Sequence, residues 1–171
     1  MKRIVLIALT VIVVLATAFV VGAFVKLDRY SWATSRSLSA ALQNSRSVVL
    51  VEHSGGVELA RKTATPDEIS RLQKVVSVWP RPFVPESYLC WVPRHSIEIV
   101  RADGSEMNAD VCFSCGKFAT EDLPFVAPLP PYLGKTLATY FASVGMAPKT
   151  DEEYTKIESS VRNRESKSTS N

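Results

Sequence analysis

Three cysteines and one histidine are the side chains of this chain whose types and spacing could do chemistry. Cys90 and His95 lie in the segment CWVPRHSIEIV, and Cys112 and Cys115 lie in the segment DVCFSCGKF. A Cys-x-x-Cys-Gly motif is typical of a metal knuckle, and Cys90 and His95 could complete a zinc site of three cysteines and one histidine. The sequence therefore makes Cys90, His95, Cys112 and Cys115 candidate metal ligands, with zinc as the cofactor.

The same residues allow three other interpretations. Thiols outside the cytoplasm tend to oxidise, and a disulfide joining Cys90 to Cys112 or Cys115 would leave one thiol free. Alternatively, His95 could activate a thiol at Cys112 or Cys115 for redox chemistry, although no helix begins directly at this motif as it does in thioredoxin-like proteins. In the last interpretation the cysteines are small, half-buried side chains with no chemical role.

The register of the hairpin around Asp103-Gly104 decides which of these residues can meet. A two-residue turn would place His95 directly opposite Cys112. A three-residue turn gives the hairpin one consistently apolar face, places His95 opposite Phe113 and directs Cys112 to the other face. We favour the three-residue turn, which argues against His95 and Cys112 binding the same ion.

A resemblance is carried by the pattern Cys-x-x-Pro-Arg-His-x-Ile, followed by a short hairpin and Val-Cys-Phe-x-Cys, between Cys90 and Cys115. This pattern resembles a family of uncharacterised bacterial proteins that often carry an N-terminal signal or anchor. No activity is assigned to that family, so the resemblance implies no function and no role for any residue.

Alternating hairpins and helices would position the cluster. Alternating apolar residues and turn glycines predict hairpins over residues 48–60 and 96–113. Helical spacing of apolar residues predicts helices over residues 66–79, with Thr65 starting a capping box, and over residues 131–144. The order β-β-α-β-β-α predicts an α+β fold: a two-layer sandwich in which an antiparallel sheet of two hairpins packs against two helices.

The first 26 residues are predicted to be a membrane anchor or a signal peptide. Ile4–Val25 contains no charged residue, and as a helix it would extend about 33 Å, close to the roughly 30 Å of bilayer hydrocarbon. We therefore expect an N-terminal transmembrane helix over residues 4–25, with the protein crossing the membrane once and its domain outside the cytoplasm. Alternatively, a signal peptide is cleaved near Ala18 and the protein is secreted.

Composition divides the rest of the chain into three parts. Residues 27–46 are rich in serine and alanine and are predicted to be a stalk or linker. Residues 47–147 form the small α+β domain. Residues 148–171 are polar with few apolar side chains, which predicts a disordered tail.

Net charge excludes one class of partner. The formal charge of +3 comes from Lys2, Arg3 and Lys26, because the chain from Leu27 onward holds 17 basic and 17 acidic residues. Without a basic patch, nucleic-acid binding has no electrostatic support. The sequence therefore predicts a single-pass membrane-anchored protein whose extracytoplasmic domain binds a protein partner or serves a structural role without catalysis. The alternative is a zinc-binding or thiol-redox protein that uses Cys90, His95, Cys112 and Cys115.

Overall fold

The computed structural model describes residues 2–77 and 90–168, with side chains described for all of these except 2–9, 23–28 and 162–168. The described residues form four helices and six strands. Their bounds are α1 Lys2–Gln43, β1 Ser45–Ser54, β2 Val57–Thr63, α2 Pro66–Val76, β3 His95–Arg101, β4 Glu106–Cys112, β5 Lys117–Thr120, β6 Ala127–Pro128, α3 Pro131–Ser143 and α4 Asp151–Ser168.

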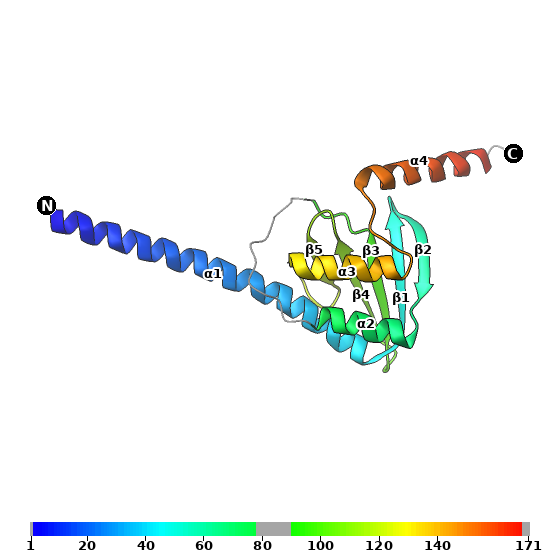
Figure 1. Cartoon of the computed structure of the whole chain (residues 1–171), viewed down its shortest axis with the longest axis horizontal. Coiled ribbons are helices and arrows are strands. Elements are labelled where there is room, and N and C mark those ends of the chain that lie inside the picture. The colour runs from blue at the N-terminus through cyan, green and yellow to red at the C-terminus, as the bar shows by residue number, and fades with distance from the viewer. Residues whose placement is uncertain (1, 78–89, 169–171) are drawn as a thin grey trace.

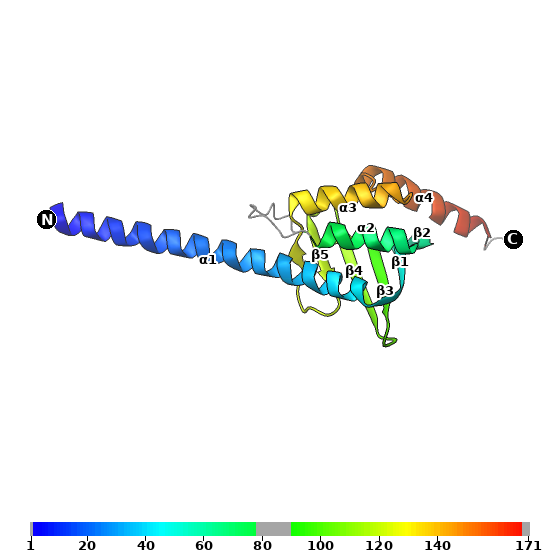
Figure 2. The ribbon, with the colours of Figure 1, turned by 60° about the horizontal axis from the view of Figure 1, so that its bottom comes forward.

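The strands form one antiparallel sheet in the order β2-β1-β3-β4-β5-β6. Strand β1 lies beside both β2 and β3, so it joins the two predicted hairpins into one sheet. Figures 1 and 2 show that α1, α2 and α3 lie on the same face of this sheet, which leaves the other face without a helical layer. The predicted α+β class is confirmed, and the sheet is larger than expected because β5 and β6 extend it.

The second half of α1 belongs to the core and is not the predicted stalk over residues 27–46. Leu38, Ala41 and Leu42 are buried and recur at helical spacing, so one side of α1 faces the sheet. Small side chains on the same side allow close approach, and the Ser31 hydroxyl donates a hydrogen bond to the carbonyl oxygen of Pro128 in β6 at 2.7 Å. The domain therefore begins within α1.

The predicted N-terminal transmembrane helix is wrong. In the part of the chain that the structure describes, no helix combines the length and the apolar character needed to cross a membrane. Helix α1 continues through the polar residues that follow Val25 and packs into the domain instead of ending there.

The predicted disordered tail over residues 148–171 contains helix α4. Tyr154 is its anchor: the side chain is 2% exposed and its hydroxyl donates to a carboxylate oxygen of Glu52 at 3.1 Å. Figure 1 shows α4 at the same end of the domain as the β1–β2 turn. There Gly55 has a φ of 56°, and a Cβ at this position would lie 3.0 Å from the Glu158 side chain. The polar composition of this segment therefore includes one buried aromatic residue, which contributes to docking the helix.

The register of β3 and β4 differs from both predicted alternatives. Ile97 pairs with Ala109, and His95 pairs with Val111. The turn has three residues as predicted but lies one residue earlier: the Arg101 backbone N–H donates to the carbonyl oxygen of Ser105 at 2.8 Å, which encloses residues 102–104. The Asp103 carboxylate supports this turn by accepting hydrogen bonds from the backbone N–H and hydroxyl of Ser105. This register differs from the favoured one by two residues, an even number, so every side chain keeps its predicted face. Ile97, Ile99, Ala109 and Val111 are all buried, as predicted.

The predicted capping box of α2 is confirmed. The Thr65 hydroxyl accepts a hydrogen bond from the Glu68 backbone N–H at 3.3 Å, and the Glu68 carboxylate accepts one from the Thr65 backbone N–H at 2.9 Å. The helix buries Leu72 and Val76. The helix ends at Val76 with Ser77 as its C-cap, earlier than the predicted end at residue 79. Residues 78–79 and the connector that follows lie outside the described residues.

Replacing Thr65 with alanine should lower the free energy of unfolding by about 1 kcal/mol, because the first turn of α2 loses a cap for its backbone N–H groups. Urea denaturation followed by circular dichroism measures this change. Ser70→Ala is the matched control, since Ser70 is exposed in the same helix and its loss should change stability by less than about 0.5 kcal/mol. Equal effects of the two substitutions would show that the cap contributes nothing specific.

Candidate functional site

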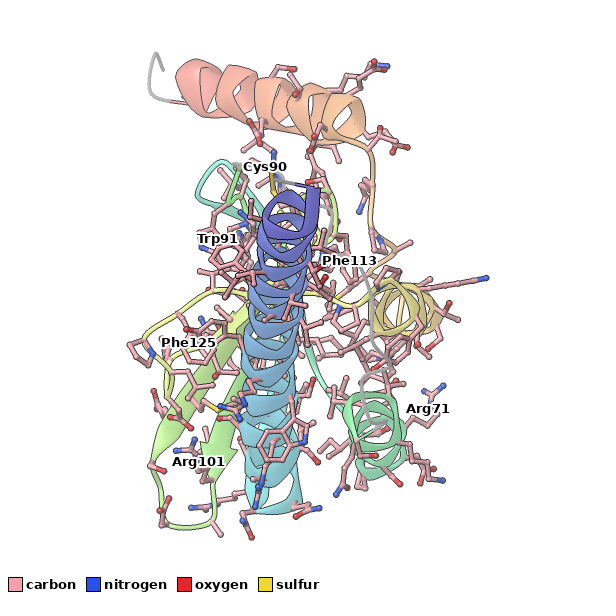
Figure 3. The ribbon with its side chains drawn as sticks, turned by 90° about the vertical axis from the view of Figure 1, so that its left-hand side faces the viewer. Arg71, Cys90, Trp91, Arg101, Phe113 and Phe125 are labelled. Atoms are coloured by element: carbon pink, nitrogen blue, oxygen red, sulfur yellow. A yellow bond between two sulfur atoms is a disulfide. The ribbon has the colours of Figure 1, made fainter. Side chains whose placement is uncertain are left out.

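The cysteine cluster lies where the chain enters β3 and where it turns from β4 into β5. Cys90 and Cys115 form a disulfide with a Cα–Cα distance of 5.9 Å, within the usual range for such bonds. Cys115 is fully buried, whereas Cys90 is exposed. The remaining cysteine, Cys112, is a buried free thiol at the end of β4. Figure 3 shows Cys90 and Trp91 at the α4 end of the domain, with Arg101 at the opposite end.

Hydrogen bonds to backbone carbonyl oxygens connect the two segments that carry the cysteines. The Arg94 backbone N–H donates to the carbonyl oxygen of Val111 at 3.3 Å, and the Lys117 ammonium donates to the carbonyl oxygen of Cys90 at 3.2 Å. In the turn that carries Cys115, Gly116 has a φ of 58°, a conformation that side chains other than glycine rarely adopt. The glycine after the Cys-x-x-Cys motif is thus needed for the β4–β5 turn, independently of any metal.

His95 is a core residue. Its ring is fully buried, Nε2 donates to the carbonyl oxygen of Met146 at 3.0 Å, and the rings of Phe113 and Phe141 lie 5.1 Å and 4.7 Å away, centroid to centroid. Burial lowers the pKa of His95 to about 4, so the imidazole is neutral at physiological pH. His95 therefore connects β3 of the sheet to the segment that follows α3, through its hydrogen bond to Met146.

The structure does not bring the four candidate zinc ligands to one point. Cys90 and Cys115 are bonded to each other, so neither offers a free thiolate. His95 points to the helix-covered face and pairs with Val111, which directs the adjacent Cys112 to the opposite face. Among residues 2–77 and 90–168, no group of three or more His, Cys, Asp or Glu side chains is placed to hold a metal ion.

A serine hydroxyl contacts two of the three sulfur atoms. The Oγ atom of Ser114 lies 3.6 Å from the Sγ atom of Cys112 and 4.0 Å from the Sγ atom of Cys115. The free thiol and one sulfur atom of the disulfide therefore contact the same hydroxyl. Neither the predicted register nor the spacing of the motif indicates this proximity, because it depends on the shape of the turn.

A second polar cluster on the open face was not predicted. His53 Nε2 lies 3.0 Å from Ser96 Oγ, and the Ser96 hydroxyl donates to the Asp110 carboxylate at 2.6 Å. No partner for His53 was predicted, because β1 and β3 are far apart in the chain and only their pairing brings these residues together. The order His-Ser-Asp differs from that of a catalytic triad, in which the histidine lies between serine and the acid. Here the serine proton is directed to the carboxylate, so His53 does not act as its base.

Arg94 connects the cysteine segment to α4. Its guanidinium forms an ion pair with Glu158 at 2.7 Å, donates to the Ser54 hydroxyl and stacks over the Tyr154 ring at 4.7 Å. Lys149 forms a further ion pair with Glu52, the carboxylate that Tyr154 contacts. These ion pairs are partly shielded from water, so the attraction between their charges is stronger than in an exposed ion pair.

Replacing Arg94 with alanine should release α4 from the domain. The loss of the ion pair and the cation–π contact should lower the free energy of docking this helix by about 1 to 2 kcal/mol. Hydrogen exchange should become faster in residues 151–161 while the sheet is unchanged. Arg61→Ala is the matched control, because Arg61 pairs with Glu98 on the exposed surface, where such pairs contribute less than about 1 kcal/mol. Unaltered exchange in α4 after Arg94→Ala would contradict this role.

The comparisons with known proteins leave the resemblance of the cysteine pattern as a prediction. No protein-family model matches the chain, and neither the curated proteins nor the solved structures gave a match.

Proposed function

We propose that this chain is a non-catalytic binding module that works outside the cytoplasm. The observation that carries the proposal is the Cys90–Cys115 disulfide, because such bonds form and persist in oxidising compartments and are rare in the reducing cytosol. The bond joins the segment before β3 to the β4–β5 turn, so it stabilises the fold.

The candidate chemical groups support a role without catalysis. His95 donates its Nε2 proton to a backbone carbonyl inside the core, and Ser96 directs its proton to Asp110. These side chains are already engaged in contacts that hold the fold together. A binding role requires instead an accessible surface, which the open face of the sheet provides.

The open face favours a partner with a basic protein surface. A shallow hollow of about 290 Å³ lies between β3 and β4 and is lined by the carboxylates of Glu98, Glu106 and Glu121. Arg61 forms an ion pair with Glu98 at 2.6 Å, and Glu106 and Glu121 leave the lining of the hollow, whose described residues include no basic side chain, with a negative charge. Charge complementarity therefore favours lysine or arginine side chains on the partner.

Two measurements test the compartment. A fusion to a reporter enzyme that needs its own disulfides should be active only if the domain is exported. Thiol counting on the denatured, unreduced protein should find one thiol per chain, and three thiols would contradict the proposal. The same protein analysed for zinc distinguishes the metal alternative, and the N-terminal residue of the exported protein tests cleavage near Ala18.

Titration of the isotope-labelled protein with an oligolysine peptide tests the partner class. The amide resonances of β3 and β4 around Glu106 and Asn108 should shift, and an oligoglutamate peptide should leave them in place. Glu106→Lys combined with Glu121→Lys should abolish the shifts, since both carboxylates are exposed and their replacement leaves the core intact. Shifts spread evenly over the chain, or shifts that persist in the double variant, would contradict a binding site at this face.

A further inference from the structure

The buried thiol of Cys112 has no part in the proposed function, yet it adjoins the disulfide. Its Sγ atom and that of Cys115 contact the same Ser114 hydroxyl, at 3.6 Å and 4.0 Å. The three cysteines thus comprise a bond between an exposed and a buried cysteine, and a buried thiol that shares a serine contact with the buried member of that bond. A change in the conformation of the β4–β5 turn would bring this thiol to the disulfide, where it could attack.

We propose that Cys112 exchanges with the Cys90–Cys115 disulfide, so that the domain also populates a Cys112–Cys115 form in which Cys90 is a free, reactive thiol. This inference rests on the disulfide of the proposed function and is independent of the partner surface. It identifies Cys90 as the site at which the domain forms mixed disulfides, and it gives a chemical role to the Cys-x-x-Cys motif.

The exchange balances without an external oxidant or reductant. The Cys112 thiol loses its proton to solvent, and the thiolate attacks Sγ of Cys115. The Cys112–Cys115 bond forms as the Cys90–Cys115 bond breaks, and Cys90 leaves as a thiolate that takes up a proton. One disulfide and one thiol exist before and after, so the oxidation state of the protein does not change.

The position of each cysteine favours this direction of attack. Cys112 and Cys115 are separated by only two residues in the β4–β5 turn, whereas Cys90 is 25 residues from Cys115 in sequence. The attack on Cys115 therefore requires only a local change in the turn. The leaving group, Cys90, is the one exposed member of the cluster, and it lies in a segment to which the Lys117 ammonium donates.

The substrate class follows from the exposure of Cys90. Once released, its thiolate can attack an accessible disulfide, either in a partner protein or in a small molecule such as oxidised glutathione. The Cys90 sulfur then forms a mixed disulfide, and one thiol of the substrate is set free. The buried Cys112–Cys115 bond remains protected from solvent during this step.

Native labelling with a maleimide tests the exchange, because trypsin separates the relevant cysteines. Cys90 falls in the peptide 75–94, since Arg81 precedes a proline and is not cleaved, and the other two cysteines share the peptide 102–117. The folded protein is labelled, quenched in acid, digested and mapped without reduction. We expect 75–94 to carry the label on Cys90, with 102–117 released as a peptide with an internal disulfide.

Variants of Cys112 provide the control. Cys112→Ser and Cys112→Ala both remove the attacking thiol, and two variants guard against a failure of either one to fold. In both, the label at Cys90 should appear about tenfold more slowly or not at all, and the two peptides should stay linked. Labelling of Cys90 at an undiminished rate in these variants would overturn the inference, as would a wild-type map in which the peptides always remain linked. Three free thiols in the starting protein would instead contradict the proposed function.

Discussion

Replacing Cys90 with serine should lower the free energy of unfolding by about 3 kcal/mol under oxidising conditions. The disulfide closes a loop with a sequence separation of 25 residues, and in the chain-entropy model a loop of this length is stabilised by roughly this amount when it is closed. Cys90 is the appropriate position because it is exposed, so serine replaces its sulfur without leaving a cavity in the core. Equilibrium denaturation in urea measures the difference from the wild-type protein.

Reduction provides the internal control for this experiment. With a thiol reductant present, the wild-type protein loses the same bond, so it should become as unstable as Cys90→Ser within about 0.5 kcal/mol. The variant itself should respond little to the reductant, since its remaining cysteines, Cys112 and Cys115, can close only a very short loop. A wild-type protein that is equally stable with and without reductant would show that the bond contributes no stability.

Local patterns predicted the hairpins, α2 and α3, because each depends on neighbours in sequence. The capping box at Thr65, the glycine turn after Ser54 and the apolar stripe of α3 all act within a few residues. The roles of α1 and α4 depend on distant contacts. Ser31 donates a hydrogen bond to β6, and Tyr154 donates one to Glu52 in β1. The composition of residues 27–46 and 148–171 does not predict either contact.

The cysteine cluster was predicted as a group, but its pairing was not. The register of β3 and β4 depends on the position of the turn, which lies one residue earlier than predicted and is supported by a side-chain hydrogen bond at Asp103, so the residue opposite His95 was misidentified. Cys90 could have bonded to either cysteine of the motif. In the structure Cys90 bonds to Cys115, whose side chain is buried in the turn that contains Gly116. This pairing depends on the backbone conformation of the turn, which residue types alone do not specify.

Lowering the pH from 7.5 to 5 should cost the folded protein about 2 kcal/mol through His95. Its pKa is about 4 in the folded state because burial disfavours the charged imidazole, against 6.5 in the unfolded chain. Between pH 6.5 and pH 4 the His95 imidazole is therefore protonated in the unfolded state and mostly neutral in the folded state. Stability is complete above pH 6.5 and falls as the pH drops toward 4, and the ring is fully buried, so solvent screening does not reduce the effect.

His95→Gln isolates this contribution, because glutamine keeps an N–H donor for the Met146 carbonyl but does not titrate. The variant should be less stable at pH 7.5, since it loses contacts with Phe113 and Phe141, yet its stability should change little down to pH 5. His53→Gln is the control, and it should retain the acid-dependent loss that His95 causes. Above pH 5 most carboxylates stay ionised, so the difference in slope between the two variants reports on the buried imidazole alone. An identical pH dependence in His95→Gln and the wild-type protein would mean that the ring is protonated without unfolding, and that Met146 and the aromatic pair do not hold it in the core.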